Sequence, residues 1–442
     1  MMEQAQGAKW PPPVPIFDNL LETGGGRMQG NSLFDTIVPE QPVDGSVCSD
    51  NNSVHDFPLC TQERGGGGSR SQLSEVSGWN QEVRNRERAQ PASSGQLAGT
   101  CFLLCSQCLI IKMTDLSVQE RAVGAVVGSL VADAAGQPLH WIYDVKRLDQ
   151  ILKGREGTPE FVDPGQGPFY RQPTGAQSGY GDQTLALLKA LVAGKGFDVQ
   201  LYRQELYKTF GPNSEYDLKG KLKGQDQVQT GGYRHASIKA FLTAYEARKE
   251  NTGSSTDPQM DGVAKVAPIV ALYAGDPKLP QYVEEVVRVT QDDNLAVQCS
   301  IAAAVILEEF ILHPPREGFL DRMKNRLELR VIAGRLPEIL QQHTTAHREV
   351  VQQIGSSCAL PGNLLNSLHC LLVSPNLSDY SDTMRQTMTA GGCNCSRLSF
   401  VGACIGAAVG SRGIPDDWIK KTRHGDLIEK LSQDLVALRV SG

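Results

Sequence analysis

The sequence has no excess of basic residues and no long apolar run. Its 442 residues include 43 Lys plus Arg against 49 Asp plus Glu, which gives a formal charge of −6. This balance excludes a generally basic, nucleic-acid-binding surface. The longest nearly apolar run, residues 97–111, is interrupted by polar residues and is shorter than the roughly 20 residues that span a bilayer. We therefore expect neither a nucleic-acid partner nor a membrane partner.

Cysteine is present without a pairing pattern. The 11 cysteines are an odd number at uneven spacing, and the chain does not begin with the basic, apolar and small-residue regions of a secretory leader. A disulfide framework is therefore not expected. The composition is typical of a reducing compartment, so we expect a cytoplasmic protein.

The first quarter of the chain lacks any sustained helical or strand period. Residues 1–113 contain the proline-rich stretch 11–15 and four consecutive glycines at 65–68. Such segments bury too little apolar surface to offset the entropy lost on ordering. We predict that residues 1–113 form a disordered, low-complexity region. An alternative is that Met113 is an internal start, so whether residues 1–112 belong to the main product stays open.

From residue 114 onward the pattern is helical. Residues 114–442 are enough for one large domain. Apolar residues recur there at spacings of three and four, which is typical of helices. The predicted helices lie near 117–135, 183–193, 199–209, 233–248, 262–274, 280–289, 294–312, 364–373, 397–410 and 425–439. No alternating run is long enough to require a sheet, so the predicted fold class is all-α.

Two of these helices carry small residues at every fourth position. These residues are Gly124, Gly128, Ala132 and Gly136 in the first helix, and Gly402, Gly406 and Gly410 in the second. Residues four apart share a helix face, so each ridge lets another backbone approach unusually closely. We predict tight packing of both ridges inside a helical core.

Three separate segments carry a resemblance to a known family. They are residues 132–144, residues 179–184 (Gly-Tyr-Gly-Asp-Gln-Thr) and residues 391–397 (Gly-Gly-Cys-Asn-Cys-Ser-Arg). In this order they resemble the ADP-ribosylglycohydrolase family, all-α proteins that cleave ADP-ribose from modified arginine or serine side chains. The string 139–144 is more narrowly similar to a divergent branch with the jellyfish J-type crystallins and selenoprotein J. The resemblance implies a single compact multi-helix domain within residues 114–442.

The resemblance also implies a site for two magnesium ions. Mg²⁺ requires oxygen ligands, and two such ions need several carboxylates to offset their charge. Asp182 keeps one acid of the family motifs, whereas Gln183, Cys393 and Cys395 stand where the other acids are found. Ser396 stands for a motif threonine. The implied metal positions are Asp182, Gln183 and Ser396, and one motif carboxylate of four survives.

Other positions take their roles from the same resemblance. His140 stands where the family has a glutamate, so Asp182 and His140 are the implied catalytic residues. The implied ligand is ADP-ribose, a related nucleotide or an ADP-ribosylated protein. The implied substrate-binding residues are Tyr180, Gly181, Gly391, Gly392 and Lys265.

The two cysteines allow a different chemistry at the same place. Thiolates and imidazole suit zinc better than magnesium, so Cys393 and Cys395, with His140 and Asp182, form an alternative metal set or a redox pair. Each residue also has a structural interpretation. Asp182 caps a helix start, the cysteines are small buried residues, and His140 is a hydrogen-bonded core histidine.

Three functions therefore stay open. The first is a divergent ADP-ribosylglycohydrolase with a pocket for ADP-ribose or a related nucleotide and a largely degenerate two-magnesium site, which would be a hydrolase if it is active. The second is a non-catalytic, crystallin-like structural protein. The third is a thiol redox protein that uses Cys393 and Cys395. The sequence does not choose among them and does not indicate an oligomeric state.

Overall fold

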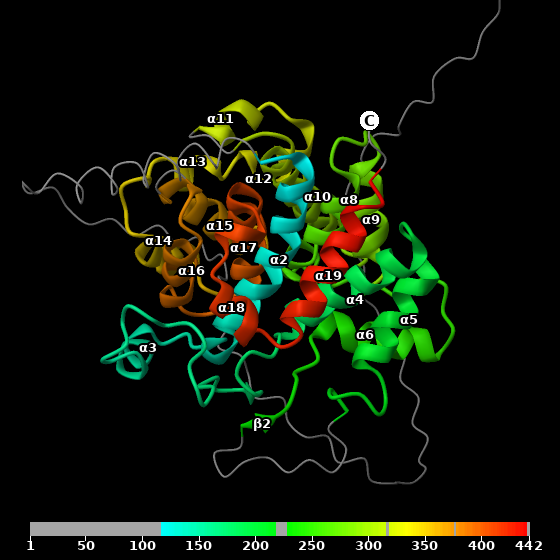
Figure 1. Ribbon diagram of the computed structural model, residues 1–442, viewed down its shortest axis with the longest axis horizontal. Helices are drawn as coiled ribbons and strands as arrows, with labels where there is room; N and C mark the ends of the chain where they lie inside the picture. Colours follow the sequence, from blue (N-terminus) through cyan, green and yellow to red (C-terminus); the bar gives the residue numbers. More distant parts are fainter. Residues whose placement is uncertain (1–115, 218–227, 315–317, 375–376, 440–442) are drawn as a thin grey trace, which may run out of the picture. The chain divides into compact units, whose positions relative to one another are not determined.

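The computed structural model describes residues 116–217, 228–314, 318–374 and 377–439, and over these residues the chain is mainly helical, as predicted (Figure 1). The predicted disordered region 1–113 lies outside the described residues. The elements up to residue 312 are α2 (Val118–Gly136), η1 (Gln137–Leu139), α3 (Val145–Ile151), β1 (Tyr170–Arg171), α4 (Gly179–Gly194), α5 (Val199–Phe210), β2 (Gln229–Thr230), α6 (Ala236–Glu246), α7 (Asp261–Ala264), α8 (Ala267–Tyr273), α9 (Leu279–Arg288) and α10 (Asn294–Leu312). They are followed by α11 (Phe319–Met323), η2 (Leu327–Leu329), α12 (Arg330–Ala333), α13 (Leu336–Leu340), α14 (His347–Ile354), α15 (Gly362–Val373), α16 (Tyr380–Thr389), α17 (Asn394–Val409), η4 (Ser411–Gly413), α18 (Asp416–Lys421) and α19 (Gly425–Val436).

Helices α2 and α17 lie side by side in the middle of the domain (Figure 1). A Cβ added at Gly124 would lie 2.2 Å from the Gly406 carbonyl oxygen, and one at Gly128 would lie 2.4 Å from that of Gly402. A Cβ and a carbonyl oxygen that are not bonded to each other cannot come this close in a packed interior. Only glycine lets these two backbones meet. We call these four residues the glycine seam, and they confirm the predicted close packing of the small-residue ridges.

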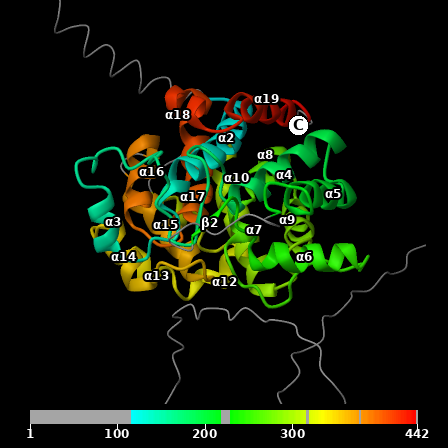
Figure 2. The same ribbon diagram turned by 90° about the horizontal axis from the view of Figure 1, so that it is seen from below.

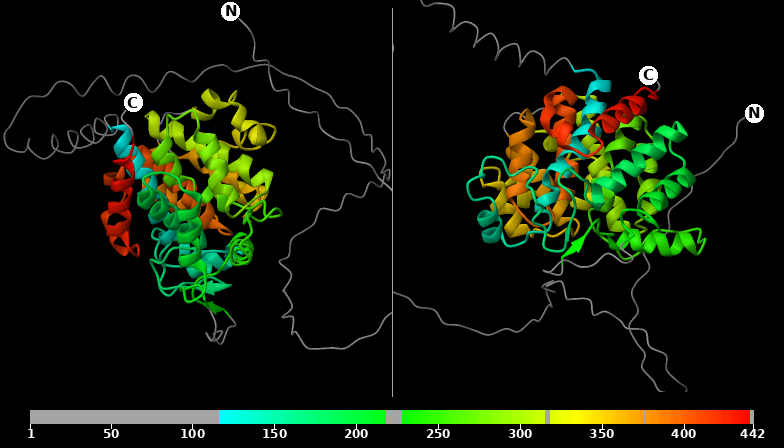
Figure 3. Two further views of the ribbon diagram at one scale, coloured as in Figure 1. Left: turned by 90° about the vertical axis from the view of Figure 1, so that its right-hand side faces the viewer. Right: turned by 60° about the horizontal axis from the view of Figure 1, so that its bottom comes forward.

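The remaining long helices cover this central pair. Helices α4, α8 and α19 pack against α2, α15 and α16 pack against α17, and α10 contacts both (Figure 2). The right-hand view of Figure 3 shows the green helices of the first half on one side of α2 and the orange helices that precede α17 on the other. The C-terminal end of α2 and the N-terminal ends of α4 and α17 meet at one end of the pair, and this arrangement positions the candidate site.

Local sequence signals set the helix starts. Ser117 caps α2 in a reciprocal arrangement in which its hydroxyl accepts from the Glu120 amide (3.2 Å) and its own amide donates to the Glu120 carboxylate (2.9 Å). Helix α4 begins at Gly179, earlier than predicted, and its cap is Ser178, whose hydroxyl accepts from the Tyr180 amide (3.1 Å). Asp182 therefore lies inside the first turn, and its interpretation as the helix cap is wrong.

Several elements differ from the sequence prediction for local reasons. The helix expected near 262–274 is divided into α7 and α8, because the chain turns at Lys265 and Val266 before Pro268 opens α8. The short helices α3, α11–α14 and α18 were not predicted, since none is long enough to show a sustained apolar period. Helix α16 was missed because its only large apolar residues are Tyr380, Met384 and Met388. Strands β1 and β2 form a two-residue parallel pair, which is too short to show alternation.

Within the part of the chain that the structure describes, two helical segments are long and apolar enough to cross a membrane. They are residues 118–139 and 294–312, and 94% and 72% of their apolar windows are buried inside the domain. Core helices of comparable length and composition meet the same criterion. Length and hydropathy are therefore weak grounds for a membrane span here, and packing accounts for both segments.

Candidate functional site

The three segments that carry the family resemblance meet at one end of α2 and α17. The Trp141 amide donates to the Gly392 carbonyl (2.9 Å), and the Gly392 amide donates to the Ile142 carbonyl (2.7 Å). The Tyr180 hydroxyl lies 3.3 Å from the Cys393 sulfur. Residues 132–144, 179–184 and 391–397 therefore form one assembly in space.

Asp133 ties the first segment to the second. Its carboxylate accepts from the Ser178 amide and from the Ser178 hydroxyl, each at 2.6 Å. Burial raises the pKa of Asp133 to about 6, although both hydrogen bonds oppose this rise. A Cβ added at Gly181 would lie 2.3 Å from the Asp133 carboxylate. The glycine at the implied ligand position 181 thus has a steric reason, and Asp133 is a site residue to which the sequence analysis gave no role.

Asp182 and Gln183 are consecutive, yet their side chains enter different surroundings. Asp182 Oδ2 accepts a hydrogen bond from the Tyr216 hydroxyl (2.6 Å). Gln183 Nε2 instead donates to Asp261 Oδ1 (2.7 Å). Neighbouring residues are about 100° apart around a helix axis, so the two implied metal positions serve separate places.

Asp182 lines a pocket of about 330 Å³ between α4, α5 and the segment before α19, which we call the Asp182 pocket. Burial raises the pKa of Asp182 to about 7, and the hydrogen bond from Tyr216 offsets part of this rise. Gln177 also lines the pocket; it is 4% exposed, and its side-chain amide has no hydrogen-bond partner among the described residues. Lys189 and Arg423 bring positive charge to the wall. The pocket therefore offers an acid, an amide and cations to a polar ligand.

Gln183 belongs to a buried group that we call the ion network, formed by Gln183, His235, Asp261 and Lys265. Asp261 Oδ1 accepts from Gln183 Nε2 and is bonded to His235 Nδ1, both at 2.7 Å. Lys265 Nζ donates to Gln183 Oε1 (3.1 Å) and to the Thr290 hydroxyl (2.6 Å). All four side chains are buried. Lys265, an implied substrate residue, is thus held inside the core by the residue at an implied metal position.

The charges of the ion network support one another. Burial raises the pKa of Asp261, but His235, Gln183 and Lys265 outweigh this and bring it down to about 2. Burial lowers the pKa of Lys265 to about 8, and Asp261 offsets part of that effect. Burial would also lower the pKa of His235, but the Asp261 carboxylate raises it above its usual value. At neutral pH the network therefore holds a carboxylate beside an ammonium group, which is the arrangement that buried charges require.

The sequence analysis did not single out His235 or Asp261. Asp261 and Lys265 stand four apart at the start of an apolar stretch, and opposite charges at this spacing share a helix face. That spacing was a usable signal for the pair. His235 follows a loop and carries no local signal that points to its partner.

Cys393 is the N-cap of α17 and is fully buried. Its sulfur lies 3.3 Å from the Tyr180 hydroxyl and 3.2 Å from the Ser396 hydroxyl. Burial raises the pKa of its thiol, but hydrogen bonds with Cys358 and His140 outweigh burial and hold it well below the usual range. Cys358 belongs to the loop between α14 and α15 and was not singled out from the sequence.

Cys395 faces other surroundings than Cys393. Its sulfur lies 3.8 Å from the Asp133 carbonyl oxygen, and burial raises its pKa well above the usual value. Two residues apart on a helix differ by about 200° around the axis. Cys395 therefore points to α2, away from the Tyr180 and Ser396 hydroxyls that lie beside the Cys393 sulfur.

The glycine turn before α17 is packed rather than open. Gly391 and Gly392 have φ values of 75° and 64°, which favour glycine. A Cβ at Gly392 would also lie 2.3 Å from the Ser356 carbonyl oxygen. The Ser396 hydroxyl accepts from Asn363 Nδ2 (2.8 Å), and Arg397 donates to the Gly391 carbonyl. Neighbouring protein groups thus occupy the polar atoms at these implied binding positions.

Aromatic rings cover His140. The Trp141 ring stacks on it with centroids 4.6 Å apart, and the rings of Tyr170 and Tyr180 meet it edge-on at 6.2 and 5.9 Å. Tyr180, the aromatic residue implied to contact substrate, is 1% exposed. The implied catalytic histidine and the implied substrate ring thus lie together within the core.

These residues do not fit two magnesium ions. Mg²⁺ takes oxygen ligands and needs nearby negative charge, whereas Gln183 already binds the Lys265 ammonium and the positions of the second motif carry thiols. Within the described ranges, no group of three or more His, Cys, Asp or Glu side chains is placed to hold a metal ion. The same result applies to the alternative zinc set of Cys393, Cys395, His140 and Asp182. The Asp182 side chain faces the Asp182 pocket and not the other three residues.

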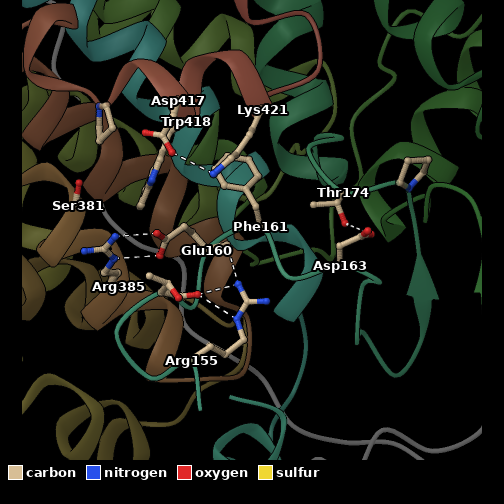
Figure 4. Close-up of a pocket in the computed structure, with 13 residues that line it drawn as sticks. Arg155, Glu160, Phe161, Asp163, Thr174, Ser381, Arg385, Asp417, Trp418 and Lys421 are labelled. Atoms are coloured by element: carbon tan, nitrogen blue, oxygen red, sulfur yellow. Dashed lines mark hydrogen bonds and ion pairs between the residues drawn. The ribbon is translucent and has the colours of Figure 1, made fainter. Parts of the chain in front are cut away.

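A further pocket of about 960 Å³ lies away from the three segments (Figure 4). Phe161 and Trp418 are among the residues that line it, and its charged side chains have protein partners. Arg385 pairs with Glu160 at 2.7 and 3.0 Å, and Lys421 pairs with a carboxylate of α18. None of the residues implied by the family resemblance lines this pocket, so it adds nothing to the candidate site.

Comparisons with known proteins agree with this geometry. The sequence model of the family described as ADP-ribosylglycohydrolase matches residues 114–442. Crystallin J1A of Tripedalia cystophora is 35% identical over 324 residues, which cover 73% of this chain and 98% of the crystallin. The ADP-ribosylarginine hydrolase Tri1 of Pseudomonas putida (strain GB-1) is 23% identical over 363 residues, which cover 80% of this chain and 85% of the hydrolase.

A solved structure supports the fold. The chain matches an ADP-ribosylglycohydrolase-related protein complex with a TM-score of 0.54 at 20% identity, over 73% of this chain and 99% of that chain. At this identity the likeness speaks for the fold alone. The family match over most of the chain and the 35% identity to a crystallin show that this chain belongs to the ADP-ribosylglycohydrolase family.

Proposed function

We propose that this protein is a non-hydrolysing member of the ADP-ribosylglycohydrolase family that serves as a structural protein of the crystallin type. The observation that carries this proposal is the contact between Lys265 Nζ and Gln183 Oε1 (3.1 Å) inside the core. A fixed ammonium group beside an implied metal position repels a divalent cation. It also fills space that a metal and its water would need.

The thiols of the second motif support the same proposal. Cys393 and Cys395 are both fully buried and have protein neighbours. Neither presents an oxygen ligand, and the site gives no route by which a metal-activated water would form. The relatives support the same proposal, because the chain is 35% identical to the crystallin and only 23% identical to the arginine hydrolase.

The Asp182 pocket favours a second candidate function, binding of ADP-ribose or a related nucleotide without turnover. The unpartnered amide of Gln177 is buried and lies at this pocket. An amide with two unsatisfied groups favours a ligand that can donate and accept hydrogen bonds. Lys189 lines the same pocket and would attract a phosphate group of that ligand, whereas Arg423 is paired with Glu215 at the rim.

Two measurements separate these candidates. Calorimetric titration with ADP-ribose, with and without Mg²⁺, measures binding, and release of ADP-ribose from modified arginine and serine peptides measures turnover. A structural protein gives neither. Binding without release, weakened by Gln177→Met, would establish the second candidate.

Hydrolysis would overturn the main proposal. The decisive result would be Mg²⁺-dependent release of ADP-ribose that Asp182→Ala abolishes. The matched control is Asp417→Ala, an exposed acid on α18 outside the Asp182 pocket, which should leave any activity unchanged.

A further inference from the structure

Two buried histidines meet where α14 packs against α15. His347 is the first residue of α14 and is 4% exposed, and His369 of α15 is 0% exposed. Their rings stack with centroids 5.6 Å apart, and the two Nδ1 atoms are 3.3 Å apart. We propose that this histidine pair is an acid-sensitive latch, which holds α14 on α15 while both rings are neutral and releases α14 when the rings take up protons.

The contacts fix the position of each ring hydrogen. His369 Nε2 lies 3.0 Å from the Gln342 carbonyl oxygen, and because a carbonyl can only accept, this nitrogen carries a hydrogen. In the neutral ring, His369 Nδ1 is then a bare acceptor, and His347 Nδ1 donates to it. His347 Nε2 is therefore bare as well; it is buried, and none of the described residues is its hydrogen-bond partner.

The closed pair has no place for another proton. A proton on His369 Nδ1 would either face the hydrogen on His347 Nδ1 or drive that hydrogen to His347 Nε2. A donor at His347 Nε2 would be buried without an acceptor, which costs the full desolvation penalty of that group. The contact between the rings is thus satisfied only while both are neutral.

A permanent charge nearby also opposes protonation. Arg397 of α17 is 0% exposed, and it donates to the Asn363 side chain (3.1 Å) and to a backbone carbonyl. Burial lowers the pKa of His347 well below its usual value, and Arg397 and His369 lower it further. Burial also lowers the pKa of His369, although the hydrogen bond with Gln342 offsets part of this effect.

The other charged side chains on the helices around the pair are exposed or bonded elsewhere. Those of α13, α14 and α16 are Glu338, Arg348, Glu349, Asp382 and Arg385. The two arginines and Glu338 form ion pairs with other residues, whereas Glu349 and Asp382 are exposed. Besides His369, α15 carries the Cys370 thiol, which is neutral because burial raises its pKa to about 11.

Acid therefore favours release of α14. In the released state both histidines meet water, where their pKa is about 6.5. Below that pH the released state binds protons that the closed pair does not, so the closed state loses stability as pH falls. His347 alone shifts the opening equilibrium by about 25-fold between pH 7 and pH 5, and His369 adds to this shift. Solvent reaches the pair through a pocket of about 500 Å³ that His347 lines.

Helix α14 also joins two parts of the candidate site. Arg348 on α14 donates to the Asp149 carboxylate of α3 at 2.7 and 2.8 Å. The Ser356 carbonyl, two residues after α14, accepts from the Cys393 amide at the start of α17 (2.8 Å). Release of α14 would loosen both contacts, so the latch would make the entrance of α17 sensitive to pH.

The test is hydrogen exchange of the full chain at pH 7 and pH 5, measured by mass spectrometry and corrected for the intrinsic rate at each pH. We expect the opening constant of α14 to rise by about 25-fold or more at pH 5, and that of α3 to rise with it. Helix α10, in the core, should change much less. No rise in α14, or equal rises in α14 and α10, would overturn the proposal.

Matched variants separate the latch from general acid sensitivity. His347→Asn keeps a donor near the position of Nδ1, and His369→Gln keeps a donor for the Gln342 carbonyl, but neither new side chain titrates. The double variant should lose the additional rise in α14. The control His343→Asn, at an exposed histidine that lines the same pocket, should keep it. Each variant is compared with itself at the two pH values, so a general loss of stability cancels.

Nitrogen-15 NMR of the natural sequence at pH 7 tests the latch without any substitution. We expect the ring hydrogens on His347 Nδ1 and His369 Nε2. Other tautomers, or rings that are already charged at pH 7 in the folded protein, would overturn the proposal. A double variant that keeps the full rise in α14 would do so as well.

Discussion

Helix α17 contacts the first half of α2 and its end in opposite ways. Along the glycine seam the two backbones touch, and a single added carbon would lie 2.2 to 2.4 Å from a carbonyl oxygen. Near the end of α2, buried polar groups join the segments instead: Asp133 bonds to Ser178, His140 bonds to Asn394, and Cys393 lies beside Tyr180. The seam tolerates no added atom, whereas the polar end depends on keeping every partner. The free energy of unfolding should therefore depend on side-chain size along the glycine seam and on charge at the polar end of α2.

The ion network gives the largest expected effect. Lys265→Met should lower the free energy of unfolding by about 3 to 5 kcal/mol, since removing one partner of a buried pair leaves the other charge uncompensated. Urea unfolding at pH 7 measures this. Lys420→Met, at an exposed lysine of α18, is the matched control and should change stability little. Equal losses in the two variants would remove the energetic role of the network.

The glycine seam comes next. Gly128→Ala should lower the free energy of unfolding by about 3 kcal/mol, because the new methyl group forces two packed backbones apart. Gly157→Ala is the control, since a Cβ there meets nothing within 4 Å. That control should be neutral or slightly stabilising. Similar stability of the two variants would show that α2 and α17 do not pack as tightly as the seam requires.

The titration of Asp182 should appear in the pH dependence of stability. The folded-state pKa of Asp182 is raised to about 7, so between pH values of about 4 and 7 the folded protein binds more protons than the unfolded chain. Its contribution to stability is therefore present at low pH and is lost as pH rises through 7. Thermal unfolding at pH 5 and pH 7.5 should show a smaller difference for Asp182→Asn than for the natural sequence. An unchanged difference would contradict this.

The surface of that pocket should matter least. Arg423 and Glu215 form an ion pair in which both side chains are well exposed, at 43% and 63%. Exposed pairs contribute less than about 1 kcal/mol. Glu215→Gln should accordingly shift the urea midpoint only slightly, and the shift should shrink further in high salt. A loss of unfolding free energy as large as that of Gly128→Ala would show that the rim of this pocket contributes to stability as much as the glycine seam does.

Part of this architecture could be predicted from the sequence. Long helices such as α2, α10 and α17 carry several turns of apolar residues. The small-residue ridges that include Gly128 and Gly402 indicated that these helices pack closely. Most of the missed helices have about two turns or fewer and show too little period, and α16 is mostly polar. The division between α7 and α8 was missed because the apolar pattern continues across the turn at Lys265 and Val266.

The site was predictable in its position but not in its contacts. The motif segments do meet, yet the Cys393 sulfur lies beside the Tyr180 hydroxyl whereas the Cys395 sulfur lies beside the Asp133 carbonyl. Spacing along a helix sets the direction of a side chain, and a separation of two residues turns it to the opposite side. Which neighbours lie in that direction depends on residues far away in the sequence, such as Tyr180 beside Cys393.

The sequence by itself determined the helical fold and the places where two backbones touch, because these follow from periodicity and from the absence of side chains at glycine, and its three motif segments carried the resemblance to the family. Only the tertiary structure decided the chemistry of the site. It turned Asp182 toward a pocket, drew Gln183 to Lys265 and set His140 beside Cys393. The physical reason is that charge and hydrogen bonding act between neighbours in space, and these neighbours come from segments that no local pattern connects.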